Sequence, residues 1–368
     1  MKIMEREEQT EERGKHAKWF WTVLLICVSC IVLSSAFIAI IDPFFHYHAP
    51  LESLEYPLLR DNERYQNDGI LEHFTYDTII TGTSMTENFK TSDVDYLLNA
   101  NSVKVPFAGG LYKEINDNLD RAYDSGNEIT KVIRCLDYEC LIEDKDATKD
   151  IYDYAEYLTN DNFFDDTKYL LNKEVFGRAA EVIIYTLSGK ESTTFDEYAN
   201  WMSNNCFGAP YVYMSYENGE PTSECRELTE EERIMIQENI AQNVVALAEE
   251  HPETTFYLYF PPYSIGYWDE LYINGEIEWR LEAEQVAIEA MIDCPNIKLY
   301  AFSDAYDWVC DLNNYADKVH YAEWVNYYIV SCMAVDKHLL TQDNYLDYLS
   351  DIREFYTNYD YDSIYLEE

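Results

Sequence analysis

Short apolar runs alternate with helical patterns along most of this chain, and no other feature limits its fold as strongly. The runs are rich in β-branched and aromatic residues and cover 77–82, 102–108, 131–136, 255–260 and 297–302. Helical patterns separate them, and the longest of these cover about 229–250 and 322–340. Strands that alternate with helices usually lie parallel in one sheet. The sequence therefore predicts an α/β fold.

A second feature is the uncharged run of 23 residues from Trp19 to Ile41. A helix that rises about 1.5 Å per residue needs about this length to cross a hydrocarbon layer of roughly 30 Å. A cleaved signal peptide is the alternative. The apolar region of a signal peptide is shorter than this run, and the small-residue cleavage site that normally follows such a region is not evident after Ile41. The run therefore predicts an uncleaved transmembrane anchor.

The charges beside this anchor predict its orientation. Arg13, Lys15 and Lys18 precede the run, and the next cation after it is Arg60. Basic residues stay on the cytoplasmic side. We therefore expect a cytoplasmic tail at 1–18 and an extracytoplasmic location for the rest of the chain in the cell envelope.

The net charge of −44 limits the class of partner. Residues 1–18 hold five Lys or Arg and five Glu, so the whole excess of acid falls on the part after the anchor. Such a surface repels nucleic acid and anionic lipid. Of the nine cysteines, Cys27 and Cys30 lie in the apolar run, and the other seven include no C-x-x-C pair and no Cys/His spacing typical of zinc, so no metal site is expected.

Composition divides the outer part into segments. Turn formers and aromatic residues at 42–75 indicate a stalk and lead-in, and the α/β domain follows at 76–340. Within it, the aromatic and acidic stretch at about 140–226 breaks the alternation and is interpreted as a helical insertion that caps the strand edges. The acidic, Tyr-rich tail at 341–368 is expected to be solvated or loosely packed.

The first strand ends in a sequence that suits chemistry. Gly82 permits a sharp turn, and Ser84 follows it at a predicted helix start, where backbone N–H groups and the helix dipole can stabilise an oxyanion. The alternative is structural, because Ser84-Met85-Thr86-Glu87 also fits a capping box. Both interpretations stay open on this stretch alone.

A second pair of residues lies near the end of the domain. Asp317 and His320 are three residues apart just before the last helix. A carboxylate that orients an imidazole makes it a base able to activate a serine hydroxyl. The alternative is a local cap or salt bridge. Because Ser84 follows the first strand and His320 follows the last, both are expected at the same edge of the sheet.

Three blocks of this sequence together resemble those of the SGNH, or GDSL-type, hydrolases. They are Gly82-Thr83-Ser84, Phe107-Ala108-Gly109-Gly110 and Asp317-x-x-His320. The chain looks most similar to membrane-anchored bacterial members related to alginate-acetylation and teichoic-acid D-alanylation proteins. The resemblance implies a three-layer α/β/α sandwich with a mostly parallel five-stranded, flavodoxin-like sheet. It also implies ester cleavage or acyl transfer on a carbohydrate, without a cofactor.

The resemblance assigns roles to individual residues. Ser84 would be the nucleophile, His320 the base and Asp317 the residue that orients it. The N–H groups of Ser84 and Gly110, with Gly109 beside them, would bind the oxyanion, although a plain turn at these glycines is the alternative. The chain departs from the family pattern at Asp137, where members commonly carry an asparagine that donates to the oxyanion.

Asp137, Tyr263 and Ser264 are predicted to contact substrate, because each follows a strand that ends at the same edge of the sheet. Ordinary packing of a proline-bent loop is the alternative for Tyr263 and Ser264. The predicted function is an extracytoplasmic serine esterase or O-acyltransferase acting on a cell-surface glycan. The predicted partners are this glycan, the membrane through the N-terminal helix and envelope-biosynthesis proteins. A non-catalytic binding or assembly protein of a surface-polymer pathway is the alternative.

Overall fold

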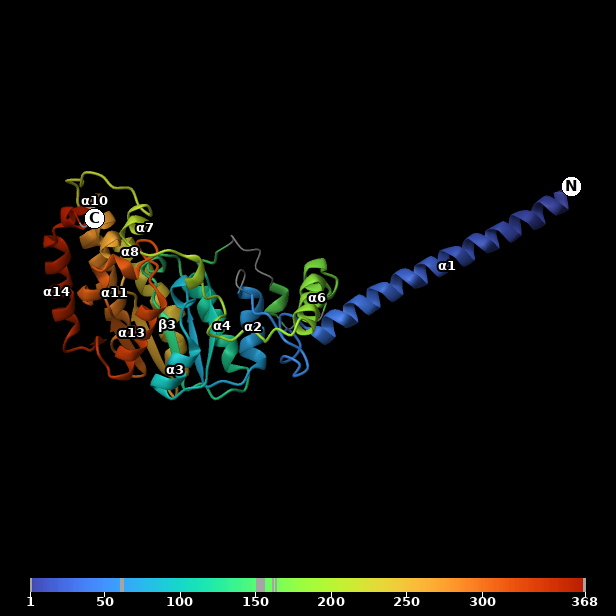
Figure 1. The fold of residues 1–368 in the computed structure, drawn as a ribbon, viewed down its shortest axis with the longest axis horizontal. Coiled ribbons are helices and arrows are strands. Elements are labelled where there is room, and N and C mark those ends of the chain that lie inside the picture. The colour runs from blue at the N-terminus through green and yellow to red at the C-terminus, as the bar shows by residue number, and fades with distance from the viewer. Residues whose placement is uncertain (1, 60–62, 150–155, 161, 163, 367–368) are drawn as a thin grey trace. The chain divides into compact units, whose positions relative to one another are not determined.

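The computed structural model describes the chain except residues 1, 60–62, 150–155, 161, 163 and 367–368 (Figure 1). The chain divides into two compact units. Unit 1 comprises Met1–Pro57 and Ala155–Ser192, and unit 2 comprises Leu58–Tyr154 and Thr193–Glu368. The two units are described separately below.

Unit 2 contains a mixed α/β structure around one sheet. In the part of the chain that the structure describes, the sheet has six strands in the order β2-β1-β3-β4-β5-β6. The strands are β1 (Thr78–Gly82), β2 (Ser102–Pro106), β3 (Lys131–Cys135), β4 (Thr255–Phe260), β5 (Ile297–Ala301) and β6 (Leu339–Leu340). All neighbouring pairs are parallel except β5 and β6. The prediction of five strands is therefore wrong, because the sheet also contains the short antiparallel strand β6. This strand lies inside the range 322–340 that was predicted to be the last helix.

Helices surround the sheet and also form unit 1. They are α1 (Lys2–Ile41), α2 (Arg64–His73), α3 (Thr91–Leu98), α4 (Tyr112–Tyr123), α5 (Asp166–Leu170), α6 (Lys173–Leu187), α7 (Ala209–Tyr213), α8 (Glu230–Ile240), α9 (Ala246–Glu250), α10 (Ile265–Asn274), α11 (Ile277–Met291), α12 (Tyr306–Val309), α13 (Glu323–Ala334) and α14 (Tyr345–Asn358). Short 3₁₀ turns are η1 (Ser84–Thr86), η2 (Tyr138–Cys140), η3 (Glu156–Leu158), η4 (Met202–Asn204), η6 (Leu312–Asn314) and η7 (Tyr361–Leu366). The π-helical turn η5 (Ala241–Val245) joins α8 to α9 without a break.

The strand order explains how the helices cover the sheet. The chain moves one way from β1 to β2 and the other way from β2 through β3, β4 and β5. Right-handed crossovers then place α3 on one face and α4, α8 and α11 on the other. The packing agrees, because α3 contacts α13 whereas α11 contacts both α8 and α14. Strands β1 and β2 are buried along their whole length, as expected for a sheet covered on both faces.

The C-terminal segment differs from the prediction of a solvated tail. Helix α14 packs against α11, and Ile352 and Tyr356 on it are fully buried. The Tyr356 ring stacks on Trp268 with centroids 3.6 Å apart, and its hydroxyl donates to the carbonyl of Ser303. The many tyrosines of this segment therefore supply core packing, which composition alone did not reveal.

The predicted insertion at 140–226 also divides differently from expectation. Residues 155–192 group with the N-terminal helix in unit 1, whereas residues 193–226 belong to unit 2. Within unit 1, α1 contains one stretch, Arg13–Ile41, that is long and apolar enough to cross a membrane. The chain turns sharply after α1 at Asp42, whose φ of 47° lies in the left-handed region.

Candidate functional site

Ser84 lies at the end of β1, where Gly82 allows the chain to turn. Gly82 has a φ of +146°, and a Cβ there would lie 2.8 Å from both the Cβ of Cys135 and the Cγ2 of Thr86. Only glycine fits such a backbone without displacing its neighbours. The next residue, Thr83, is the N-cap of η1, and Ser84 is the first residue of this turn.

The capping-box interpretation of Ser84 is therefore wrong. Thr83 caps the turn with its own hydroxyl, which accepts from the N–H of Met85, and Glu87 lies at the other end of η1. The Ser84 side chain is thus left for other contacts. Its N–H also has no acceptor inside the turn, because the first N–H groups of a helix point outward.

The Ser84 hydroxyl meets the imidazole of His320. Ser84 Oγ lies 2.8 Å from His320 Nε2, and Asp317 Oδ2 lies 2.7 Å from His320 Nδ1. A carboxylate only accepts, so Nδ1 carries the proton and Nε2 is left to accept from the serine hydroxyl. The structure thus brings together the serine, histidine and aspartate that the sequence singled out, in the geometry of a serine–histidine–acid triad.

The loop that holds Asp317 and His320 is closed on itself. Tyr315 and Tyr321 pair as an antiparallel bridge, and the N–H of Ala316 donates to the carbonyl of His320 at 2.9 Å. The other oxygen of Asp317, Oδ1, accepts from the N–H of His320 at 2.8 Å. The carboxylate is therefore fixed by the backbone as well as by the ring.

The charges around the pair favour a basic imidazole. Burial lowers the pKa of His320, but the hydrogen bond and charge of Asp317, with the carboxylates of Asp137 and Glu139 nearby, outweigh this and raise its pKa above 6.5. Burial raises the pKa of Asp317, but its hydrogen bonds with His320 and Val319 and the charge of the ring lower it further, to below 3.8. Asp317 is therefore ionised at neutral pH.

Asp137 does not take the place of the missing asparagine donor. Its Oδ2 accepts from the hydroxyl of Thr83 at 2.7 Å, and its Oδ1 accepts from the hydroxyl of Tyr263 at 2.6 Å and from the N–H of Glu139 at 3.1 Å. Burial and the neighbouring Asp137 raise the pKa of Tyr263, so its phenol stays protonated as the donor. The carboxylate therefore acts as an acceptor that fixes Thr83, the neighbour of the candidate nucleophile.

Tyr263 and Ser264 are likewise not placed to contact substrate as predicted. Tyr263 is 2% exposed and Ser264 is fully buried. Ser264 donates from its hydroxyl to the carbonyl of Lys318 at 2.7 Å, and the N–H of Lys318 donates to the hydroxyl of Ser215 at 2.9 Å. The loop after β4 therefore packs against the loop of Asp317 and His320 through Ser264, and the proline-bent packing that was the alternative is what the structure has.

The two glycines predicted at the oxyanion site form a tight turn. Gly109 has a φ of +59°, and the N–H of Gly110 donates to the carbonyl of Phe107 at 2.7 Å. A Cβ on Gly110 would lie 2.7 Å from the Cβ of Phe107, so the close approach requires glycine. The predicted role of the Gly110 N–H conflicts with this bond, which leaves the Ser84 N–H as the better placed of the two predicted donors.

Aromatic side chains that the sequence analysis did not single out flank the histidine. The Trp201 ring meets the His320 ring edge-on with centroids 5.8 Å apart. Phe207 stacks on Trp201 at 6.1 Å and contacts Trp324 on α13 at 5.7 Å. Trp324 is 44% exposed. We call Trp201, Phe207 and Trp324 the aromatic ledge. Because Trp201 and Phe207 lie in a loop, no periodic pattern marked them.

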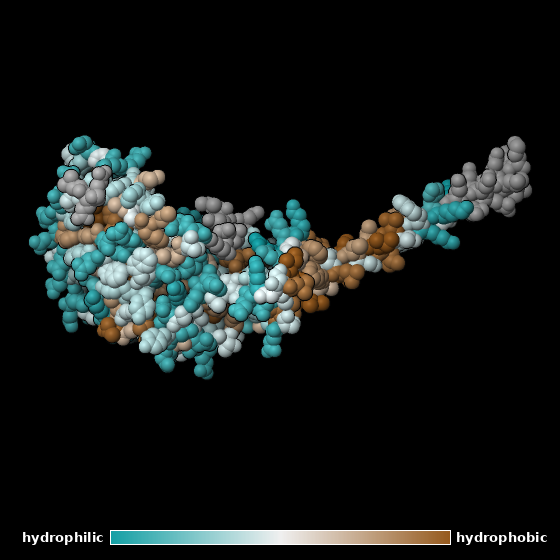
Figure 2. Space-filling view, viewed as in Figure 1, coloured by the Kyte–Doolittle hydropathy of each residue, from teal (hydrophilic) through white to brown (hydrophobic). Residues whose placement is uncertain are grey.

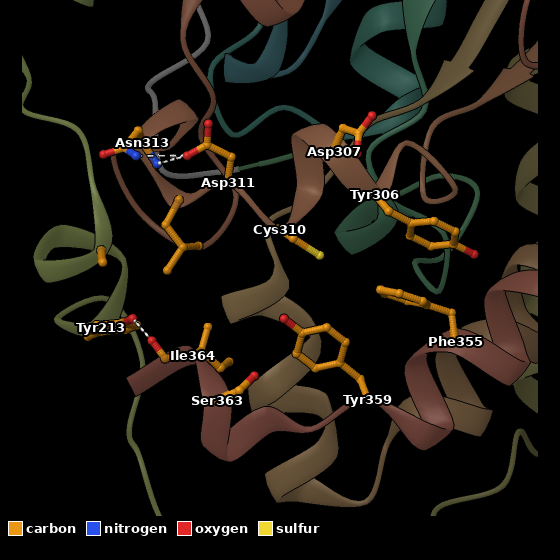
Figure 3. Close-up of a pocket in the computed structure, with 12 residues that line it drawn as sticks. Tyr213, Tyr306, Asp307, Cys310, Asp311, Asn313, Phe355, Tyr359, Ser363 and Ile364 are labelled. Carbon is orange, nitrogen blue, oxygen red and sulfur yellow. Dashed lines mark hydrogen bonds between the residues drawn. The ribbon is translucent and has the colours of Figure 1, made fainter. Parts of the chain in front are cut away.

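One hollow of unit 2 lies apart from the triad. It is a cavity of about 650 Å³ between α12, α14 and the segments around α7 and η7, and no member of the triad lines it (Figure 3). The rings of Tyr306 and Phe355 stack on one side with centroids 3.8 Å apart. On another side the hydroxyl of Tyr213 donates to the carbonyl of Ile364 (Figure 3). The cavity therefore does not belong to the candidate site.

Comparison with known proteins does not assign a family. No family model matches the chain, and no curated protein matches it. A solved structure from Streptococcus pneumonia, provisionally described as a platelet activating factor, is 12% identical with a TM-score of 0.38. That similarity covers 79% of this chain and 92% of the other. A TM-score this low carries no argument about fold or activity.

Proposed function

We propose that this chain is a membrane-anchored serine esterase or O-acyltransferase of the SGNH type that acts on acyl groups of a cell-surface glycan. The observation that carries the proposal is the continuous row of hydrogen-bonding groups from Ser84 through His320 to Asp317, with contacts of 2.8 Å and 2.7 Å. An activated serine beside an oriented imidazole is suited to acyl chemistry. Of the described residues, none has to hold a cofactor for this reaction.

In the proposed mechanism, Ser84 Oγ attacks the ester carbonyl while His320 Nε2 takes the hydroxyl proton. The negative charge that develops on the carbonyl oxygen is stabilised by the Ser84 N–H, which has no acceptor inside the three-residue turn η1. Collapse breaks the ester C–O bond, and His320 gives the proton to the leaving sugar oxygen, which departs as a hydroxyl group. Water or a second hydroxyl then attacks the acyl-serine with His320 again as base, which restores Ser84.

The aromatic ledge supports a carbohydrate as the substrate class. The apolar C–H face of a sugar ring packs on aromatic rings, and the ledge begins in contact with the imidazole. An acyl group at Ser84 would therefore leave its sugar within reach of Trp201. Acidic groups around His320, including Glu139, favour a neutral or cationic glycan over a polyanion.

The proposal is tested with a serine-directed fluorophosphonate probe and with p-nitrophenyl acetate. The full-length protein should be labelled and should hydrolyse the ester, and Ser84→Ala should abolish both. Ser203→Ala, an exposed serine on η4, is the matched control and should retain both. Equal labelling of the Ser84→Ala variant, or no labelling of the unmodified protein, would contradict the proposal.

The proposed location is the cell membrane, with the N-terminus in the cytoplasm and the rest outside. Support comes from the apolar stretch Arg13–Ile41 of α1 and from the basic residues at its start. Cys206 is an exposed thiol of unit 2. A membrane-impermeant maleimide added to intact cells should modify Cys206, and protection of this thiol until lysis would reverse the proposed orientation.

A non-catalytic glycan-binding protein is the second candidate. It is favoured by the shortage of oxyanion donors, since the Gly110 N–H is engaged by Phe107 and Asp137 only accepts. The loss of one donor typically lowers the rate by about 10² to 10³. Binding of an acetylated glycan without any Ser84-dependent turnover would favour this candidate.

A further inference from the structure

Helix α6 in unit 1 carries an apolar stripe on its surface. Phe176, Ile184 and Leu187 are 42%, 65% and 82% exposed, and Ala180 lies between them. Their spacing of four, four and three residues places them on one side of the helix. We call these four residues the α6 stripe.

The stripe lies beside the face that α6 buries, and Phe176 at its start also packs on Phe37 of α1. Val175, Ala179 and Val182 form that buried face, and Val175 and Ala179 each directly precede a residue of the stripe. Arg178 and Glu181, which pair at 2.8 Å, lie with Glu174 on the remaining side, whereas Lys173 in the first turn lies in line with the stripe. The apolar surface of α6 therefore includes the buried face and also the exposed side chains of the stripe. Monomeric soluble proteins rarely leave such an apolar surface uncovered.

Helices α5 and α6 are attached to the last turns of α1. The hydroxyl of Ser35 on α1 donates to the carbonyl of Leu170 at 3.3 Å, and the rings of Phe37 and Phe176 lie 5.3 Å apart. The hydroxyl of Tyr169 on α5 donates to Asp42, just after α1, at 2.7 Å. These contacts hold the α6 stripe at the height of residues 35–42 of the N-terminal segment.

That height corresponds to the outer boundary of a membrane crossed by α1. If Trp19 lies at the inner interface, a rise of about 1.5 Å per residue places Phe37 about 27 Å further along the helix. The hydrocarbon layer is roughly 30 Å thick, so Phe37 and its neighbour Phe176 reach the region where acyl chains meet headgroups. Apolar surface extends along α1 to the end where α6 lies (Figure 2).

We propose that α6 is an interfacial helix whose stripe inserts into the outer leaflet of the bilayer that α1 crosses. The inference rests on the proposed transmembrane role of α1. A helix with one apolar arc and one charged face lies in the plane of the interface, with its apolar side in the acyl boundary. The continuity of the stripe with the apolar surface of α1 selects lipid as the occupant over a protein partner.

The experiment uses full-length protein in liposomes that contain phosphatidylcholine with an alkyne-tagged acyl chain. The photoreactive residue p-benzoylphenylalanine is placed at Leu187, and lipid adducts are measured after illumination. Ile31 in the apolar stretch of α1, 51% exposed, is the positive control, and Met214 in unit 2, 84% exposed, is the negative control. Thermal unfolding of each variant verifies that the chain is folded.

The Leu187 variant should give lipid adducts several-fold above the Met214 variant, and so should a variant with the probe at Ile184. Adduct at Ile31 with only the Met214 level at both Leu187 and Ile184 overturns the inference while leaving the anchor intact. A cross-link from Leu187 to a second protein chain in place of lipid also overturns it. Absence of adduct at Ile31 would instead contradict the anchor, and the interfacial role of α6 falls with it.

Discussion

Two contacts of His320 determine how the candidate site should depend on pH. The raised pKa of its imidazole, caused mainly by Asp317 acting against burial, keeps the ring protonated to a higher pH than a free histidine. A protonated ring cannot accept the proton of Ser84. We therefore expect kcat/KM for p-nitrophenyl acetate to fall as the pH is lowered through a pKa above 6.5.

Replacement of Asp317 should change this profile in a defined direction. In Asp317→Asn the negative charge is lost, so the pKa of His320 falls and the acid limb moves to lower pH. The rate on the plateau should fall by on the order of 10⁴, because an amide does not enforce the tautomer with a proton on Nδ1. A pH–rate profile of both proteins measures the shift, and an unmoved acid limb would show that Asp317 does not control the imidazole.

Gly82 should be required for stability as well as for the position of Ser84. Gly82→Ala places a Cβ 2.8 Å from Cys135 and Thr86 at a φ of +146°. Overpacking and backbone strain each cost about 1 to 3 kcal/mol, so the free energy of unfolding should fall by at least this amount. Gly177→Ala on α6 is the control, because open space surrounds it and alanine suits a helix. Unfolding in denaturant compares them, and equal stabilities would contradict the packing argument.

At the residue scale, the sequence predicted which side chains form the candidate triad better than it predicted which side chains are buried. Ser84, Asp317 and His320 were found because a nucleophile, a base and an acid are required together and the topology predicts where their strands end. Tyr263 and Ser264 were misassigned, because a sequence shows which residues follow a strand but not which of them are then buried. The hydroxyl groups of Thr83 and Tyr263 that donate to Asp137 come from segments far apart in the chain, so no local pattern marked these contacts.

The elements show a similar division between local and distant causes. Each of the five predicted strands begins within one residue of its observed start, because apolar β-branched runs are local signals. Strand β6 has only two residues and follows α13 closely, so no period of two could develop. The different grouping of 155–192 and 193–226 depends on tertiary contacts, which composition does not record.

The aromatic ledge should contribute to polymer recognition. Trp324→Ala removes the ring of the ledge that contacts Phe207 and leaves the Trp201 ring, which contacts His320, in place. One lost stacking contact is worth about 1 kcal/mol. We therefore expect kcat/KM for acetylated xylan to fall about five-fold relative to that for p-nitrophenyl acetate. Tyr96→Ala, an 83% exposed ring on α3, is the control. An unchanged ratio in Trp324→Ala would exclude the ledge from substrate binding.

The net charge of the whole molecule allows a prediction that does not depend on any single residue. The net charge of −44 lies entirely on the residues after position 18, because the first 18 residues are neutral in sum. This charge creates a negative electrostatic field around that part of the chain. Such a field lowers the local concentration of a polyanion and leaves a neutral polymer unaffected. It should therefore affect how readily a polymer approaches Ser84 rather than the contacts within the triad.

Salt should consequently distinguish the charge class of the substrate. Between about 0.01 M and 0.15 M salt the screening length falls from about 30 Å to about 8 Å, so repulsion weakens sharply. We expect kcat/KM for acetylated polygalacturonate to rise over this range, whereas kcat/KM for acetylated xylan stays constant. The p-nitrophenyl acetate rate measured in the same buffers controls for effects of salt on the triad. A polygalacturonate rate that is high at low salt and falls on adding salt would mean that a local basic surface, rather than the net charge, governs how polymer reaches Ser84.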